Sequence, residues 1–462
     1  MRQITPQALA GPLLGGPEGT HQGPADRRFR RAGAAGVFLL LGVNALAGVL
    51  LQAPCFHHGW DFPRSSFRQC ASPMAGALSG LGFPDAAGRA PGDLAGFSPV
   101  TAWAVALGRS VSADDPAAAM AFLVLFSVLA VAVLGIALWV LAGRSGRPWL
   151  PLAFVSPVVF LSIGQSLDTV GVAAALWALV LVDPREPLGR TTTGRLVGAG
   201  VLLAVGLFVN PLAALVVAGL VLVMVRRGTG RDLPVLLGSL AIAAGVCVLA
   251  DGRVVSRLRA WWAEPVDRGS FASVVATLPD TDPVRLARTA VAVGLGVLLA
   301  VVAVAALRML VGASRGNRGR GLGTAEAPHD LAVLVTVFLG TALLVLPAAP
   351  VTSALWLLPF AVLAVHRMWV HGAWMLSELG LFLAVNLADA NAADAGTGLS
   401  NPWLVFFTML RLLAVLVVVV AAGEGLLRRV LTAGLGPVGP GPVGPGPAPT
   451  DSRRETDSVS VS

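Results

Sequence analysis

The sequence contains no lysine and no tyrosine, and it has only three cysteines and few charged residues. All 33 basic residues are arginine, and charged side chains make up 13% of the 462 residues. Hydrophobic residues make up 55% of the chain. This balance argues against a water-soluble globular domain, because such a domain has too little interior to bury so much apolar surface.

The apolar residues come in runs of near bilayer length rather than in short alternating segments. Such runs are typical of transmembrane helices, whereas a β-barrel needs alternating strands. We therefore predict an all-α, polytopic transmembrane bundle of about twelve spans. The predicted spans are 33–52, 117–142, 148–163, 168–183, 196–209, 212–225, 233–250, 289–307, 331–347, 353–365, 372–388 and 403–422.

The arginines lie mainly in every second connection between these spans. With the N-terminus inside, 22 arginines fall on the inner side, ten on the outer side and Arg411 within a span. Because cytoplasmic connections are enriched in basic residues, this bias predicts a plasma-membrane protein with both termini cytoplasmic. Topology thus accounts for the net charge of +8 without a nucleic-acid partner.

The predicted organisation is a membrane domain between two polar tails. Residues 1–31 and the Gly/Pro-rich residues 431–462 are predicted to be disordered cytoplasmic tails. The membrane domain, 32–430, carries two long extracytoplasmic loops, 53–107 and 252–288. The first apolar run follows a long polar stretch, which favours an uncleaved span over a signal peptide.

Two of the cysteines lie in the first outer loop. Cys55 and Cys70 are fifteen residues apart on the predicted oxidising face, which favours a disulfide. The alternative is a zinc site formed by Cys55, His57, His58, Asp61 and Cys70. The ligand types suit zinc, but the spacing matches no closed tetrahedral pattern. The sequence requires no metal, and a role for a divalent ion stays open.

Three charged residues at or within predicted spans are candidates for a function. Asp168 lies at the outer mouth between two short spans, where it is either a functional acid or a solvated N-cap. Glu378 and Arg411 lie inside the last two spans. Because an isolated buried charge is costly, we expect these two to pair; a substrate path is the alternative.

The second outer loop combines arginines with adjacent tryptophans. Arg257, Arg259 and Arg268 lie near Trp261 and Trp262, a combination that suits an interfacial helix at the lipid headgroups. Guanidinium groups also bind phosphate well. The loop is therefore either an interfacial anchor or a phosphate site.

Short motifs follow one another in a particular order from about residue 33 to 430. They are Cys55 with Gly59-Trp60 and Cys70, Phe97-Ser98-Pro99-Val100, Ser156-Pro157, Ser166-Leu167-Asp168, Asn210-Pro211, Asp267-Arg268-Gly269-Ser270, Leu355-Trp356-Leu357-Leu358-Pro359, and Trp374 with Glu378. This order resembles the actinobacterial branch of glycosyltransferase family 87, whose members are polytopic GT-C-type membrane enzymes.

The resemblance implies transfer of a hexose, of mannose type, from a polyprenyl-phosphate sugar to an envelope glycolipid or glycan at the outer membrane face. Asp168, with Asp61 as second choice, would deprotonate the acceptor hydroxyl. Arg257, Arg259 and Arg268 would hold the departing phosphate. The lipid-linked sugar is the donor, and no further cofactor is implied.

Three positions depart from the family pattern. Pro73, Phe97 and Phe208 stand where the family has an aspartate, a glutamate and a lysine. Neither proline nor phenylalanine can act as a base. These departures favour, as an alternative, a non-catalytic paralogue that binds lipid-linked sugar or serves as an envelope scaffold. A transporter is a third hypothesis, less favoured because the chain shows no convincing inverted repeat.

Overall fold

The structure is a computed structural model, and it describes residues 27–79, 97–112, 115–145, 156–182, 192–256, 268–278, 282–314, 327–347, 349–365, 367–394 and 396–434. Within these ranges the regular structure is entirely helical. The chain divides into two units, residues 1–423 and 424–462. The described part of the second unit is the end of α18, and the other described elements belong to the first.

Six helices in the described ranges are long and apolar enough to cross a membrane, which makes this a membrane protein. They are α2 (Arg27–His58), α6 (Pro116–Ser145), α11 (Leu233–Ala250), α14 (Pro283–Ser314), α17 (Met368–Ala393) and α18 (Asn401–Gly434).

Further apolar helices are shorter than a bilayer-crossing helix. They are α8 (Asp168–Val182), α9 (Thr193–Val209), α10 (Ala213–Arg226), the apolar part Asp330–Val345 of α15 (Ala327–Val345), and α16 (Ala354–Ala364), which the 3-10 helix η4 (Val351–Ser353) precedes. Because these helices are short, twelve membrane crossings stay a prediction.

The described helices fall where the sequence predicts spans. The predicted third span, 148–163, is represented by α7 (Pro157–Ser162), and residues 146–155 lie outside the described residues. Ser156 is the N-cap of α7: its Oγ accepts a hydrogen bond from the Val158 N–H, and Pro157 occupies the first helical position. Most of the two predicted tails, 1–26 and 435–462, also lies outside the described residues.

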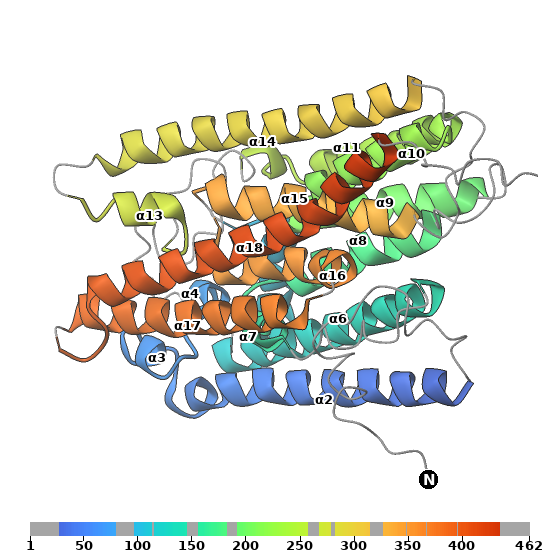
Figure 1. The fold of residues 1–462 in the computed structure, drawn as a ribbon. Coiled ribbons are helices and arrows are strands. Elements are labelled where there is room, and N and C mark those ends of the chain that lie inside the picture. The colour runs from blue at the N-terminus through green and yellow to red at the C-terminus, as the bar shows by residue number, and fades with distance from the viewer. Residues whose placement is uncertain are drawn as a thin grey trace, which may run out of the picture. The chain divides into compact units, whose positions relative to one another are not determined.

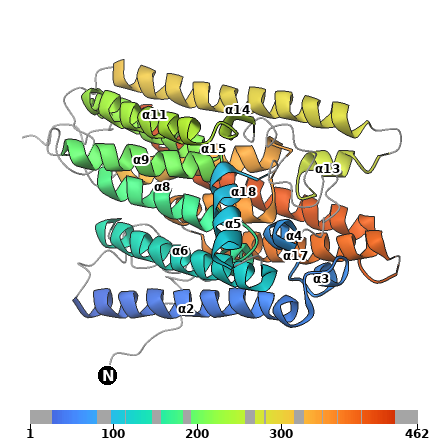
Figure 2. The same ribbon diagram turned by 180° about the vertical axis from the view of Figure 1, so that it is seen from behind.

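Short helices occupy the two predicted outer loops. The first loop contains α3 (Arg64–Phe67), α4 (Pro73–Ser79) and α5 (Pro99–Val111), and the second contains α13 (Phe271–Val275). Figures 1 and 2 show α3 and α13 at the same end of the bundle as the connection between α17 and α18. Segments far apart in the sequence therefore meet at one end.

The core lies around α8 and α16, whose side chains are mostly buried. In contrast, α11 and α14 expose many large apolar side chains, among them Leu249 and Leu299. Figures 1 and 2 show α14 along the edge of the bundle. Apolar surface of this kind suits contact with lipid.

Candidate functional site

Asp168 is the first residue of α8, and its side chain is nearly buried, with 5% exposed. Its Oδ1 accepts hydrogen bonds from Asn210 Nδ2 at 2.9 Å and from Trp356 Nε1 at 2.8 Å. Its Oδ2 accepts one from Ser166 Oγ at 2.9 Å. All three donors are neutral, so this carboxylate is stabilised by hydrogen bonds and by the N-terminus of α8.

Asn210 reaches Asp168 because α9 stops there. Asn210 is the C-cap of α9, its backbone is extended (φ −155°), and Pro211 follows it, which prevents the helix from continuing. Its Oδ1 accepts a hydrogen bond from the Leu212 N–H at 3.0 Å. With the amide oxygen occupied by this turn, the amide NH₂ faces the carboxylate.

Trp356 reaches Asp168 because α8 has a glycine one turn further on. A Cβ at Gly171 would lie 2.6 Å from Trp356 Cζ2 and 2.9 Å from Val209 Cγ1. Trp356 is fully buried in α16. The missing side chain at Gly171 therefore lets the indole pass close to α8 and donate to Oδ1.

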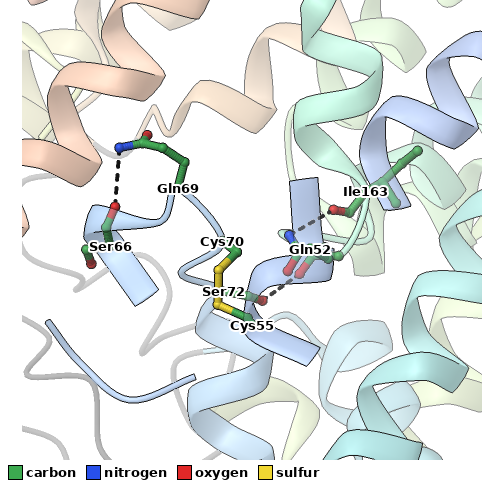
Figure 3. Close-up of a disulfide and its surroundings, with 8 residues drawn as sticks. Gln52, Cys55, Ser66, Gln69, Cys70, Ser72 and Ile163 are labelled. Atoms are coloured by element: carbon green, nitrogen blue, oxygen red, sulfur yellow. Dashed lines mark hydrogen bonds between the residues drawn. A yellow bond between two sulfur atoms is a disulfide. The ribbon is translucent and has the colours of Figure 1, made fainter. Parts of the chain in front are cut away.

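Cys55 and Cys70 form a disulfide with a Cα–Cα distance of 6.0 Å (Figure 3). Because the two sulfurs are bonded to each other, they are not free to bind zinc as thiolates together with His57 and His58. Within the described ranges, no three or more His, Cys, Asp or Glu residues are grouped to hold a metal ion. Asp61 lies in the same loop and is exposed.

The end of α2 and the predicted first outer loop are hydrogen-bonded to the turn that leads into Asp168. Ser72 Oγ donates to the Gly164 carbonyl at 2.5 Å, and Gln52 Nε2 donates to the Ile163 carbonyl at 3.5 Å (Figure 3). Gly164 has a positive φ of 74°, which favours glycine. The loop and the Asp168 turn thus form one connected region.

Glu378 in α17 and Arg411 in α18 form a fully buried ion pair. Arg411 Nε lies 3.0 Å from Glu378 Oε1, and the same oxygen accepts a hydrogen bond of 2.9 Å from Trp374 Nε1. Both side chains are at most 1% exposed, so each charge depends on the other for compensation.

The Arg411 guanidinium also donates hydrogen bonds to two segments between helices, one just before α13 and one between α15 and η4. Its Nη1 donates to the carbonyls of Gly269 at 2.9 Å and Ala349 at 2.7 Å, and its Nη2 donates to that of Pro350 at 3.3 Å. The chain then runs from Pro350 through η4 to Trp356. One short segment therefore connects the Arg411 pair to Asp168.

The predicted phosphate-binding arginines are described only in part. Arg257 and Arg259 lie outside the described residues. Arg268 forms an ion pair with Asp389 of α17, and its backbone carbonyl accepts a hydrogen bond of 3.4 Å from Thr408 Oγ1. The structure thus places Arg268 against the C-terminal part of α17 and the N-terminal part of α18.

The partners of Asp168 were missed by sequence reasoning. Asn210 and Trp356 lie in motifs singled out in the sequence, but no role was assigned to either. The available signal was chemical: a buried indole N–H and a buried amide each need an acceptor, and Asp168 is an acid at the same predicted end.

No family model matches the chain, and comparison with curated proteins and with solved structures finds no match. The fold and the site define the class as a polytopic helical membrane protein. Its buried carboxylate, Asp168, lies where α8 begins and α9 ends.

Proposed function

We propose that this protein is a GT-C-type membrane glycosyltransferase, transferring a hexose of mannose type from a polyprenyl-phosphate sugar to an envelope glycolipid or glycan. The observation that supports this is the convergence on Asp168. Asn210 and Trp356 are 42 and 188 residues away in the chain, yet both donate to its Oδ1. Each comes from a separate motif of the resemblance to glycosyltransferase family 87.

In this proposal Asp168 is the general base. Asn210 and Trp356 fix Oδ1, and the acceptor hydroxyl would replace the rotatable Ser166 hydroxyl at Oδ2. The acceptor oxygen attacks the anomeric carbon, its proton passes to Asp168, and the bond from that carbon to the phosphate oxygen breaks. Asp61 is the second choice of base. The leaving polyprenyl phosphate would be held by Arg257, Arg259 and Arg268.

The proposal includes twelve membrane crossings in the plasma membrane, with both termini cytoplasmic and the Asp168 end facing outward. Two observations support it. The described helices fall where the spans are predicted, and α3 and α13, from the two predicted outer loops, lie at one end of the bundle (Figures 1 and 2). The arginine bias supplies the direction.

A second function is favoured by a different observation. Asp168 is 5% exposed, and its carboxylate already accepts hydrogen bonds from three side chains. Such an arrangement suits a carboxylate that only links helices to one another. Pro73, the first residue of α4, and Phe208, buried in α9, stand where the family has an aspartate and a lysine. Neither side chain carries a charge. In this alternative the protein binds lipid-linked sugar, or acts as an envelope scaffold, without transferring the sugar.

The test is a transfer assay. The purified full chain in lipid nanodiscs is mixed with radiolabelled polyprenyl-phosphate mannose and envelope membrane extract. Labelled glycolipid or glycan is the expected result. Saturable donor binding without product, under conditions where a family 87 enzyme gives product, contradicts the transferase and supports the non-catalytic alternative.

A further inference from the structure

The hydrogen bonds of Arg411 differ from those of an arginine that only pairs with an acid. An arginine that serves a carboxylate usually donates two parallel hydrogen bonds to its two oxygens. Arg411 instead gives Glu378 one donor, Nε at 3.0 Å, and both of its Nη atoms donate to backbone carbonyls. Among the described residues, Glu378 Oε2 is buried without a hydrogen-bond partner. The guanidinium therefore makes more hydrogen bonds to the backbone than to the acid that balances its charge.

The three carbonyls come from two segments that are far apart in the sequence. Nη1 donates to Gly269 at 2.9 Å and to Ala349 at 2.7 Å, and Nη2 donates to Pro350 at 3.3 Å. A Cβ at Gly269 would lie 2.9 Å from Arg411 Nη1 and 3.2 Å from the Ala349 carbonyl oxygen. The missing side chain at Gly269 thus lets the two carbonyls meet at one nitrogen.

Pro350 is joined to Trp356 by regular structure. The Pro350 carbonyl also accepts a hydrogen bond of 3.0 Å from the Ser353 N–H, and Ser353 is the N-cap of α16. Trp356 is the third residue of α16, roughly 10 Å further along the helical rise. Val351, Ser353 and Trp356 are all buried. Because a helical segment packed in a core moves as a unit, a displacement of the Pro350 carbonyl also displaces the Trp356 indole.

Apolar side chains pack around the same carbonyls. Val351 of η4 lies in one buried cluster with Leu161 of α7 and Leu381 of α17. Leu381 Cδ2 would also lie 3.2 Å from a Cβ at Gly269. The carbonyls that Arg411 holds therefore belong to a closely packed junction between α7, η4 and α17.

We propose that Arg411 is a positioning residue: by holding the three carbonyls together, it keeps the Trp356 indole on Oδ1 of Asp168. Glu378 balances the charge of Arg411, whereas the carbonyl contacts set the geometry. The consequence for sugar transfer rests on the proposed function, because it requires Asp168 to be the base. The control of Trp356 by Arg411 does not depend on transfer.

Three substitutions separate the carbonyl contacts from the charge. Arg411→Lys keeps a cation for Glu378, but a single ammonium group lacks the planar fork that reaches both segments. Gly269→Ala leaves both charges in place and introduces a Cβ that would lie 2.9 Å from Arg411 Nη1. Glu378→Gln does the reverse: it removes the charge of the acid, retains an oxygen for Arg411 Nε and leaves the three carbonyl contacts in place.

The measurement is the hydrogen-exchange rate of the Trp356 indole N–H. It is followed by NMR in the full chain with ¹⁵N-labelled tryptophan in lipid nanodiscs, and the Trp356 signal is assigned as the one absent from Trp356→Phe. Trp103, which donates to Asp251 at 2.8 Å, is assigned in the same way and provides an internal control. A general loosening of the fold acts on both indoles, whereas a loss of positioning acts on Trp356 alone.

Arg411→Lys and Gly269→Ala are expected to raise the exchange rate of Trp356 about tenfold or more, because its hydrogen bond to the carboxylate opens more often. Glu378→Gln is expected to leave that rate within about twofold of the wild type, since the carbonyl contacts persist. The exchange rate of Trp103 is expected to stay unchanged in all three variants.

Three results would overturn the proposal. Equal effects of Arg411→Lys and Glu378→Gln would show that the ion pair alone matters. An unchanged Trp356 rate in either Arg411→Lys or Gly269→Ala would show that the carbonyl contacts do not position the indole. Equal rises at Trp103 and Trp356 would show that the whole fold has loosened.

Replacements are at hand for variants that do not fold. If Arg411→Lys does not fold, Gly269→Ala decides alone. If Glu378→Gln does not fold, Trp374→Phe takes its place, because it removes a donor to Glu378 Oε1 and leaves every Arg411 contact in place. It is expected to leave the exchange rate of Trp356 unchanged.

The transfer assay distinguishes this role from the proposed function. If the wild type transfers sugar, Arg411→Lys and Gly269→Ala are expected to lower the rate per folded protein about tenfold or more. The expected exchange pattern without transfer by the wild type supports the positioning role and contradicts the transferase alone. Transfer by the wild type with an unchanged Trp356 rate in the variants contradicts the positioning role alone.

Discussion

The indole N–H of Trp356 donates a 2.8 Å hydrogen bond to Oδ1 of Asp168, joining α16 to the start of α8. A second pair of the same kind, Trp103 Nε1 to Asp251 Oδ2, has the same length of 2.8 Å. Trp356 is fully buried, whereas Trp103 and Asp251 are only half-buried. The two pairs therefore allow the same change to be compared in two environments.

We predict that Trp356→Phe destabilises the protein much more than Trp103→Phe. The buried change removes a donor from a charged acceptor and leaves a cavity, at a cost of about 2–4 kcal/mol; the half-buried change should cost about 1 kcal/mol. The measurement is the free energy of unfolding in mixed micelles. Equal losses in the two variants would show that the Trp356–Asp168 contact contributes no special stability.

The Glu378–Arg411 pair is predicted to behave as one unit. Arg411→Met leaves the Glu378 carboxylate buried without compensation and is expected to cost about 3–5 kcal/mol. The double variant Arg411→Met/Glu378→Met removes both charges, and we expect it to lose less stability than Arg411→Met alone. Thermal and denaturant unfolding of the wild type, Arg411→Met, Glu378→Met and the double variant provides the double-mutant cycle.

Arg226 and Asp330 provide the matched control for this pair. Their ion pair is 3.4 Å long, and the side chains are 31% and 13% exposed. Because water screens such a pair, Arg226→Met should cost at most about 1 kcal/mol. If Arg411→Met costs no more than Arg226→Met, the buried pair does not anchor α17 to α18.

The pairings in this structure were easier to predict than the convergence on Asp168. Cys55 with Cys70, and Glu378 with Arg411, follow from elementary needs: two cysteines share one predicted outer loop, and a buried charge needs an opposite one. No such rule specifies that Asp168 meets Trp356, because helical periodicity does not tell which helix ends adjoin.

The ends of the helices were also harder to predict than the presence of the helices. The long apolar runs predict the membrane helices well, but α2 continues to His58, beyond the predicted end at residue 52. Cys55 therefore lies in the last turns of a helix rather than in a loop. Polar residues such as Gln52 continue the helix there because they pack against the α7–α8 turn, a tertiary contact that local sequence does not encode.

The disulfide predicts a simple labelling pattern. Under denaturing, non-reducing conditions a maleimide should modify Cys247 alone, because Cys55 and Cys70 are bonded to each other. After reduction all three cysteines should react. Mass spectrometry of the intact protein counts the adducts, and three adducts without reduction would contradict the pairing.

Membrane orientation can be tested at two positions that precede and follow the helix α11 in the chain. In a Cys247→Ser background, Phe271→Cys lies in α13 and Arg231→Cys lies before α11, and both native side chains are exposed. An impermeant maleimide added to intact cells should label Phe271→Cys and leave Arg231→Cys unlabelled. The reverse pattern would place the Asp168 end in the cytoplasm and contradict an outer-face reaction.

The most direct test of the proposed function compares sugar transfer by Asp168→Asn and Asp251→Asn. The asparagine at 168 can still accept from Trp356 and Asn210 and donate to Ser166, so the fold should survive while the base is lost. We expect the transfer rate to fall by about 100-fold or more with Asp168→Asn, and to stay within about twofold with Asp251→Asn. An unchanged rate with Asp168→Asn would contradict Asp168 as the catalytic base.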